Sequence, residues 1–346
     1  MRKTAWGVAL ALAIFIAAWF YRGDSGVSGE NGAMNDSRVA HGQSADAVLH
    51  IKPGLPMRGG AAGGAKLTPL MQELFSAKGW SDILERLRSA TQRTPEESWV
   101  LAEILDKCGQ VTDRKPPEGP AGFAIKPTGE EARNRFVASI SDKDPNRDKR
   151  IAAYDRMRID RCGNIRSSTT TSIAEIDALR QAAAAAGDAK GRIWLARNLP
   201  GEAKFEVIKQ VMRSGDPFAM ETAGFYLAFG TEDFSLRAGP QELPVDNEAF
   251  TSAMRLVACD FGRSCGPEAE DMAWSCASRG QCDAHDLREH LFFYRSSPSQ
   301  SQLIVEYHEA LTRAARDGDW SYFTPHRGPA PVAAMFNPPP KPAPSR

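Results

Sequence analysis

The sequence has no excess of charge of either sign. Its 346 residues include 43 Lys and Arg and 43 Asp and Glu, so the formal net charge is zero. Proteins that bind nucleic acids usually carry a basic excess or a basic stripe that pairs with phosphates, and none stands out here. We therefore expect no nucleic-acid partner.

Several motifs that carry catalysis or cofactor binding are also absent. No Gly-x-Ser-x-Gly sequence occurs, and no group of Ser, His and acidic residues is typical of a hydrolase. The glycine-rich stretch 59–66 (GGAAGGAK) breaks the pattern of a phosphate-binding loop in either register. His285 and His290 are five residues apart, whereas zinc hydrolases place two histidines four apart on one helix face. The sequence thus predicts no catalytic site, no cofactor and no metal site.

The six cysteines are too few for a small disulfide-dense protein, and no Cys-x-x-Cys redox motif occurs. Four of them form two Cys-x5-Cys pairs, whereas zinc sites favour two to four intervening residues. We expect the bonds Cys259–Cys265 and Cys276–Cys282, each closing a loop at a helix end. Cys108 and Cys162 both precede a glycine at a predicted helix end, which predicts a third bond. For Cys259, Cys265, Cys276 and Cys282, the alternatives are other pairings, a zinc site or a redox-active pair.

The N-terminus indicates export. Arg2 and Lys3 precede the apolar run 5–21 (AWGVALALAIFIAAWFY), which as a helix would be about 25 Å long, close to the lower limit for crossing a bilayer. We expect residues 1–22 to be an uncleaved single-pass anchor in an inner membrane, with the bulk of the chain in the periplasm. A cleaved signal peptide, giving a periplasmic or secreted protein, is the alternative. Either compartment is oxidising and suits disulfide bonds.

The remaining chain divides into a tether, a helical domain and a tail. Residues 23–66 are rich in Gly, Ser, Asn and Ala without a sustained hydrophobic period, which predicts a flexible tether. Between 67 and 325 one helix signal follows another, including capping boxes that begin at Thr94 and Ser297. These signals predict an all-α domain. Residues 326–346 are rich in proline and are expected to form a disordered tail.

One pattern occurs twice within the helical region. The segments AAAGDAKGRIWLA and VMRSGDPFAMETA lie 28 residues apart, and each contains a Gly-Asp pair, at 187–188 and at 215–216. Glycine can adopt the left-handed conformation of a tight turn, and aspartate can cap the helix that follows. Each pair is therefore expected to join two antiparallel helices. The Gly-Asp pair at 318–319 is expected to act in the same way.

On these residues, 173–229, the chain resembles the tetratricopeptide-like families of helical repeats, whose units carry small residues at the helix crossing and a tight turn. The resemblance implies antiparallel helix pairs, here in an irregular, solenoid-like domain because the period does not continue beyond this stretch. Trp194, Phe225, Tyr226 and Phe229 form an aromatic-rich group in the same region. They are candidates for a groove that binds a protein or peptide, and packing at a helix crossing is the alternative.

Three polar residues in predicted helices give weaker signals. Glu221 could be the acid of a peptidoglycan-cleaving transglycosylase, but the flanking signature of that family is missing, and a solvated glutamate is the expected role. His290 lies on the apolar side of its helix and is expected to be packed. His308 is expected to be partly exposed.

The sequence therefore favours a membrane-tethered helical protein of the cell envelope that acts as a binding or scaffold module for a protein or peptide partner. The predicted link to the membrane is the N-terminal helix. One alternative is a hydrolase or lyase that acts on an envelope polymer of the peptidoglycan type. Another is a secreted effector, which would require cleavage near Gly29.

Overall fold

The structure of the chain is a computed structural model, and it describes residues 67–76, 78–113, 129–230 and 234–328. All described residues belong to one compact unit. No helix within the described ranges is long and apolar enough to cross a membrane. The predicted anchor and tether lie outside the described residues.

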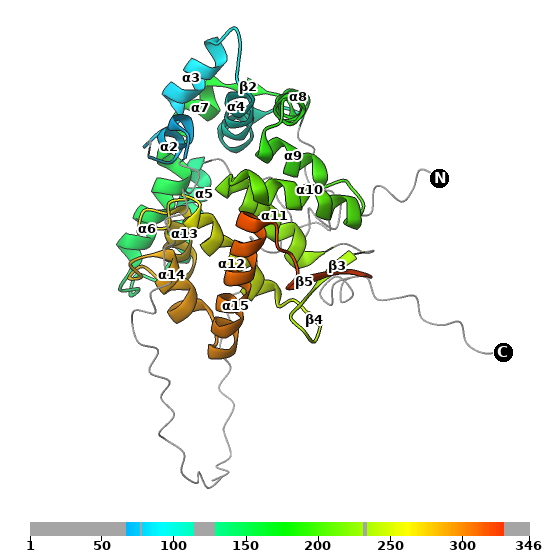
Figure 1. Cartoon of the computed structure of the whole chain (residues 1–346). Coiled ribbons are helices and arrows are strands. Elements are labelled where there is room, and N and C mark those ends of the chain that lie inside the picture. The colour runs from blue at the N-terminus through cyan, green and yellow to red at the C-terminus, as the bar shows by residue number, and fades with distance from the viewer. Residues whose placement is uncertain (1–66, 77, 114–128, 231–233, 329–346) are drawn as a thin grey trace, which may run out of the picture. The chain divides into compact units, whose positions relative to one another are not determined.

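Most of the described chain is helical (Figure 1). The helices are α2 (Pro69–Ser76), α3 (Ser81–Ser89), α4 (Pro95–Cys108), α5 (Gly129–Ser139), α6 (Arg147–Asp155), α7 (Ile165–Ser168), α8 (Ile173–Ala185), α9 (Ala189–Ala196), α10 (Gly201–Ser214), α11 (Pro217–Phe229), α12 (Asn247–Asp260), α13 (Glu270–Arg279), α14 (Leu287–Glu289) and α15 (Pro298–Asp317), with π-helical segments η1 (Arg156–Asp160) and η2 (His290–Arg295). The strands are β1 (Gln110–Val111), β2 (Thr170–Thr171), β3 (Phe234–Ala238), β4 (Leu243–Pro244) and β5 (Phe323–Arg327). The predicted helical fold is confirmed, but the all-α description is incomplete because of these strands.

The strands form two small sheets. β1 and β2 pair in parallel, and β3 lies between β4 and β5 in an antiparallel sheet. The prediction that Gly-Asp 318–319 joins two helices is wrong, because β5 follows this junction instead of a helix. Phe323 at the start of β5 is buried against the rings of Phe250 and Tyr307, and this burial favours the strand. The predicted tail at 326–346 also begins too early, since β5 continues to Arg327.

The other two Gly-Asp junctions form as predicted. Gly187 and Gly215 have φ values of 91° and 72°, which glycine adopts without strain. The Asp188 carboxylate accepts a hydrogen bond from the amide of Gly191 at 2.9 Å, and Asp216 accepts from the amide of Ala219 at 2.9 Å. The capping boxes of α4 and α15 are also complete.

Helices α8 to α12 pack each on the next along the chain, as in a stack of helix pairs. Gly191 of α9 allows a close crossing, because a Cβ atom there would lie 2.5 Å from the backbone nitrogen of Ala184 in α8. Elsewhere the packing joins distant helices: α4 packs on α8, α6 on α13, and α12 on α15. The neighbour-only order of a solenoid is thus limited to the middle of the described chain.

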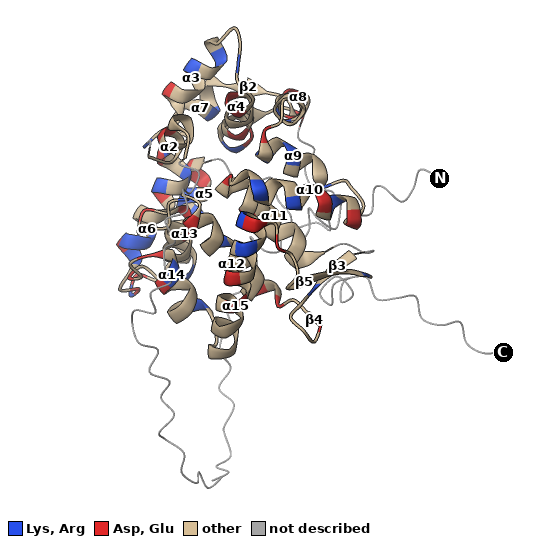
Figure 2. Ribbon diagram, viewed as in Figure 1, with Lys and Arg blue, Asp and Glu red and all other residues tan. Residues whose placement is uncertain are grey.

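Three disulfide bonds join Cys108 to Cys162, Cys259 to Cys265 and Cys276 to Cys282. This confirms the predicted disulfides, in the pairing that the helix ends favoured. Basic and acidic residues are interspersed along the helices that Figure 2 shows.

Candidate functional site

The predicted aromatic group is divided between two helices. Trp194 lies on α9, whereas Phe225, Tyr226 and Phe229 lie on α11, and all four side chains are partly buried. The ring centroid of Phe225 is 4.7 Å from that of Phe229 and 6.2 Å from that of Tyr226. Tyr226 and Phe229 also pack against the main hydrophobic core, which contains residues from α9 to α12, α15, β3 and β5. Part of this group therefore stabilises the helix packing.

Trp194 belongs to a row of alternating rings and cations. The guanidinium carbon of Arg180 lies 5.6 Å from the ring centroid of Trp99 and 5.6 Å from that of Trp194. The guanidinium carbon of Arg197 lies 4.0 Å from the Trp194 ring. Such contacts are favourable because the π-face carries negative charge. We call Trp99, Arg180, Trp194 and Arg197 the arginine–tryptophan row.

The two arginines of this row differ in their partners. The Arg180 side chain is only 11% exposed and forms ion pairs with Glu103 at 2.8 Å and with Asp106 at 2.9 Å. Burial disfavours its charge, but the two carboxylates outweigh burial and raise the pKa of Arg180. Arg197 forms no ion pair with any described residue, and Trp194 is its side-chain contact. The row thus ends in a cation that forms no ion pair with the carboxylates of the described ranges.

Tyr226 connects the row to the aromatic group on α11. Burial raises the pKa of its hydroxyl, and the positive charges of Arg197 and Arg180 oppose this shift. The Nζ atom of Lys204 lies 5.4 Å from the Tyr226 ring centroid. Trp194 and Tyr226 are therefore brought together around shared cations. The hydroxyl of Tyr226 stays protonated at neutral pH and can donate a hydrogen bond.

Two exposed leucines flank Arg197 in the sequence. Leu195 is 42% exposed and Leu199 is 39% exposed.

The sequence did not predict the two arginines of the row. The spacing of Trp194 and Arg197, three residues apart at the end of a helix, could have indicated their contact. Arg180 comes from another helix, and no local signal indicates its position.

Glu221 is not the solvated residue that the sequence predicts. Its side chain on α11 is 28% exposed, and it lies 3.1 Å from Nη1 of Arg263 and 3.5 Å from Nε of Arg255. The same two arginines face Asp271 of α13, at 2.9 Å for Arg263 and 3.8 Å for Arg255. The four side chains thus form a largely buried ionic cluster between α11, α12 and α13.

The two carboxyl groups of this cluster have shifted pKa values. Burial raises the pKa of Glu221, against the attraction of Arg263 and with the repulsion of Asp271. Burial acts in the same direction on Asp271, but Arg255 and Arg263 outweigh it and lower the pKa of Asp271. Two carboxyl groups with opposite shifts are the arrangement that general acid–base catalysis requires. A structural ion-pair network produces the same shifts.

The histidines have different environments. His290 is 3% exposed and stacks on Tyr294, so the prediction of a packed histidine is confirmed. His308 is only 4% exposed, and its Nε2 atom lies 2.8 Å from the carboxylate of Asp260 on α12. The prediction that His308 is partly exposed is wrong, because α15 packs this face on α12. Within the described ranges, no three His, Cys, Asp or Glu residues gather so that they could hold a metal ion.

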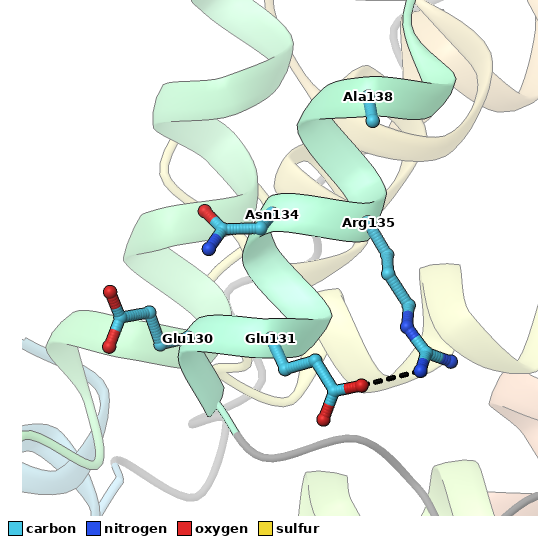
Figure 3. A pocket seen from close by; sticks show the side chains of 5 residues that line it. All are labelled: Glu130, Glu131, Asn134, Arg135 and Ala138. Carbon is cyan, nitrogen blue, oxygen red and sulfur yellow. Dashed lines mark hydrogen bonds and ion pairs between the residues drawn. The ribbon is translucent and has the colours of Figure 1, made fainter.

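Two surface hollows lie away from these residues. The first, of about 470 Å³, is lined by one face of α5, and Figure 3 shows its side chains pointing outward from that helix. The second, of about 620 Å³, lies between residues of α3 and residues 164–169. Neither hollow includes a candidate residue of the aromatic group or of the ionic cluster.

No protein family model, no curated protein and no solved structure matches this chain. The resemblance to tetratricopeptide-like repeats therefore stays a prediction. What the chain does must be inferred from its own side chains. Arg197 lies over the Trp194 ring and forms no ion pair among the described residues.

Proposed function

We propose that this protein is a binding or scaffold module that holds a protein or peptide partner on the surface around Trp194 and Arg197. The helix pairs α8–α9 and α10–α11, proposed to be of the tetratricopeptide-like type, form the support of this surface. The observation that carries the proposal is the Arg197 guanidinium, which lies 4.0 Å from the Trp194 ring and makes no ion pair within the described residues.

Three features support this assignment. Arg and Trp are enriched among the residues that contribute most to binding energy at protein interfaces. Arg197 is held by a ring, so less side-chain entropy is lost when a partner binds it. Leu195 and Leu199, two residues before and two residues after Arg197, are exposed and add apolar area to the same segment of the chain.

The proposed location is the cell envelope. The three disulfide bonds support an oxidising compartment, since the reducing cytosol disfavours such bonds. The basic pair and apolar run at the N-terminus support a membrane anchor with the helical domain in the periplasm.

Site-specific crosslinking in the native host tests the function. A photoreactive amino acid in place of Leu199 should give a discrete crosslinked partner, which Trp194→Ala and Arg197→Glu should each remove. Phe293→Ala is the matched control, because Phe293 is an aromatic residue that is 70% exposed on η2. The proposal fails if no partner is crosslinked, or if the control removes the crosslink as well as the two test variants do.

A second candidate is an envelope-polymer hydrolase or lyase with Glu221 as its acid. The raised pKa of Glu221 beside the lowered pKa of Asp271 favours it. The purified protein would clear a cell-wall substrate in a zymogram, and Glu221→Gln would abolish the clearing. A wild-type protein that leaves the substrate intact would exclude this candidate.

A further inference from the structure

We infer that the partner of the surface around Trp194 presents an acidic segment, in which a carboxylate pairs with Arg197 and a neighbouring apolar side chain packs on Leu195 and Leu199. This inference rests on the proposed function and names the chemistry of its partner.

The charge of this surface is not balanced within the described chain. Arg180 is neutralised by Glu103 and Asp106, both on α4. Arg197, at the C-terminal cap of α9, receives only the partial negative charge of that helix end and of the Trp194 ring. A carboxylate that approached Arg197 would add attraction without displacing an existing ion pair.

The stacking on Trp194 also selects the kind of anion. A guanidinium whose face lies on a ring keeps its N–H edges available, and these edges match the two oxygens of one carboxylate. The neighbouring Arg180, which also contacts Trp194, is 11% exposed and already paired, so it cannot serve as a second docking cation. Of the two arginines of the row, Arg197 is therefore the one that remains without an ion pair among the described residues, and it matches a single carboxylate.

The apolar contribution comes from the residues on either side of Arg197. The Leu195 residue is 42% exposed and Leu199 is 39% exposed. Exposed leucines in the same segment as an arginine that lies over a ring provide the apolar contacts and the directed polar contact that a peptide-binding surface combines. A segment in which acidic and apolar residues alternate would provide a carboxylate for Arg197 and an apolar side chain for the leucines.

Fluorescence anisotropy with labelled peptides tests the inference on the full chain with its disulfides intact. The probe is a peptide in which Glu and Leu alternate, compared with peptides in which Gln or Lys replaces Glu, or Gly replaces Leu. We expect the Glu–Leu peptide to bind about tenfold more tightly than the Gln–Leu peptide, and the Lys–Leu peptide not to bind. Binding of the Glu–Leu peptide should weaken as salt concentration rises.

Two variants assign the binding to Arg197. Arg197→Gln should lower the affinity for the Glu–Leu peptide about tenfold. Leu199→Ser should also lower this affinity, but without changing its salt dependence. Arg316→Gln is the matched control, because Arg316 also lies over an aromatic ring, that of Phe261 at 6.0 Å, and forms no ion pair in the described part of the chain. Unchanged thermal unfolding of each variant shows that it is folded.

Three outcomes overturn the inference. The first is equal affinity for the Glu–Leu and Gln–Leu peptides. The second is an equal loss of affinity in Arg197→Gln and Arg316→Gln. The third is binding of inorganic phosphate or anionic vesicles at Arg197 as tight as that of the peptide. If the crosslink at Leu199 still depends on Trp194 in any of these cases, the proposed function stands and only the acidic partner is wrong.

Discussion

Arg263 forms an ion pair with Asp271, with 2.9 Å between Nη2 and Oδ2. Arg263 lies inside the loop that the bond Cys259–Cys265 closes, and Asp271 lies in the first turn of α13. The preceding residue, Glu270, pairs with Arg161 at 2.8 Å. Arg161 directly precedes a cysteine of the first disulfide, and α13 itself carries Cys276 of the third. All three disulfides are therefore connected through α13.

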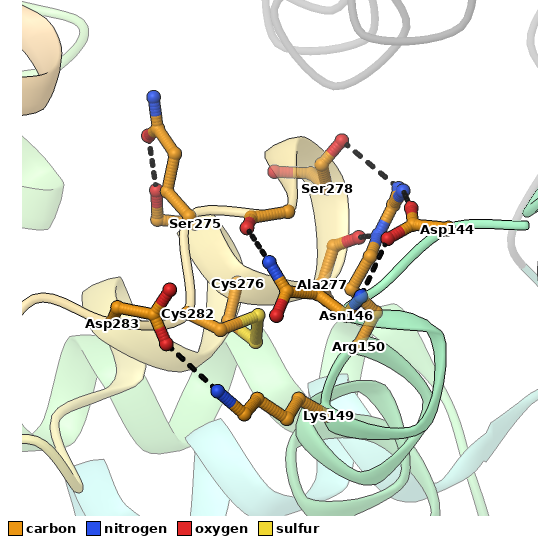
Figure 4. Close-up of a disulfide and its surroundings, with 12 residues drawn as sticks. Asp144, Asn146, Lys149, Arg150, Ser275, Cys276, Ala277, Ser278, Cys282 and Asp283 are labelled. Atoms are coloured by element: carbon orange, nitrogen blue, oxygen red, sulfur yellow. Dashed lines mark hydrogen bonds and ion pairs between the residues drawn. A yellow bond between two sulfur atoms is a disulfide. The ribbon is translucent and has the colours of Figure 1, made fainter.

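The third disulfide also positions a docking site for α6. Figure 4 shows Asn146 and Arg150 directed at the loop that the bond Cys276–Cys282 closes. The Nε atom of Arg150 donates to the carbonyl oxygen of Ala277 at 2.9 Å, and Nδ2 of Asn146 donates to that of Gly280 at 2.9 Å. Because the acceptors are backbone carbonyls, their positions depend on the conformation of the loop.

Replacing both cysteines of this bond by serine should release α6 from α13. The loss of the cross-link should lower the free energy of unfolding by about 2 kcal/mol on the chain-entropy model. Hydrogen exchange measured by mass spectrometry should show faster exchange in residues 147–155, because the carbonyls that hold α6 are no longer fixed.

The bond Cys259–Cys265 provides a control, because it closes a loop of the same length. Both bonds have a sequence separation of 6, so the chain-entropy cost is the same. Its double serine variant should lose similar stability while residues 147–155 keep their slow exchange. Equal acceleration of exchange in the two variants would show that α6 is not held by the 276–282 loop.

Arg263→Met should destabilise the protein strongly. The substitution leaves Glu221 and Asp271 facing only Arg255 in a largely buried cluster, and loss of one partner of a buried ion pair costs about 3 kcal/mol. Urea unfolding followed by circular dichroism measures the change. Arg135→Met is the control, because the Arg135–Glu131 pair on α5 is exposed and should contribute less than about 1 kcal/mol.

Local signals in the sequence were sufficient to predict the N-termini of four helices. The caps at Thr94, Asp188, Asp216 and Ser297 depend on residues within a few positions, and each forms as predicted. The disulfide pairing was also accessible, because each short loop ends at a helix end. These predictions succeed because they depend on contacts within one turn or one loop.

The ionic cluster and the arginine–tryptophan row could not be predicted in the same way. No local signal in the helix of Glu221 or in the disulfide-closed loop of Arg263 indicates their contact, and the packing of α11 on α12 brings the two segments together. Arg180 likewise meets Trp99 because α8 packs on α4, and it meets Trp194 because α8 packs on α9. Strand β5 was missed because its short segment FTPHR contains a proline and only one large apolar residue.

Protonation of His290 should destabilise the fold at mildly acid pH. Burial, together with repulsion from Arg295 and Arg279, lowers the pKa of His290 to about 4, whereas Asp271 opposes this shift. In the unfolded chain the pKa is about 6.5, so the unfolded state binds a proton first as the pH falls. Neutral His290 therefore contributes its full stabilisation above pH 6.5. As the pH falls towards 4, the free energy of unfolding decreases by about 3 kcal/mol in total.

The free energy of unfolding, measured by urea titration across this pH range, checks the His290 prediction. His290→Phe should flatten the profile. His285→Gln should leave it steep, because His285 is 88% exposed and contacts Glu289 of its own turn. A steep profile in His290→Phe would assign the acid sensitivity to another group.

Lys190 connects the two copies of the Gly-Asp pattern. Its Nζ atom lies 2.8 Å from Asp216 and 3.1 Å from Asp188, the two aspartates that occupy equivalent positions in the pattern, and 3.6 Å from Glu96 of α4. The Lys190 side chain is only 4% exposed. Burial disfavours its charge, but Asp216 and Asp188 outweigh burial and raise the pKa of Lys190.

Lys190→Met should therefore destabilise α9 and α11 together. The apolar part of the side chain is kept, but three carboxylates are left without their shared cation, at a cost of about 3 kcal/mol or more. Thermal unfolding should shift to lower temperature, and hydrogen exchange should increase in the first turns of both helices. Lys209→Met removes a lysine that pairs with Glu206 on the surface of α10, so it should change neither measurement appreciably. Faster exchange in α9 alone would mean that Lys190 does not stabilise the cap of α11, and that the two helix pairs are held together by their apolar contacts.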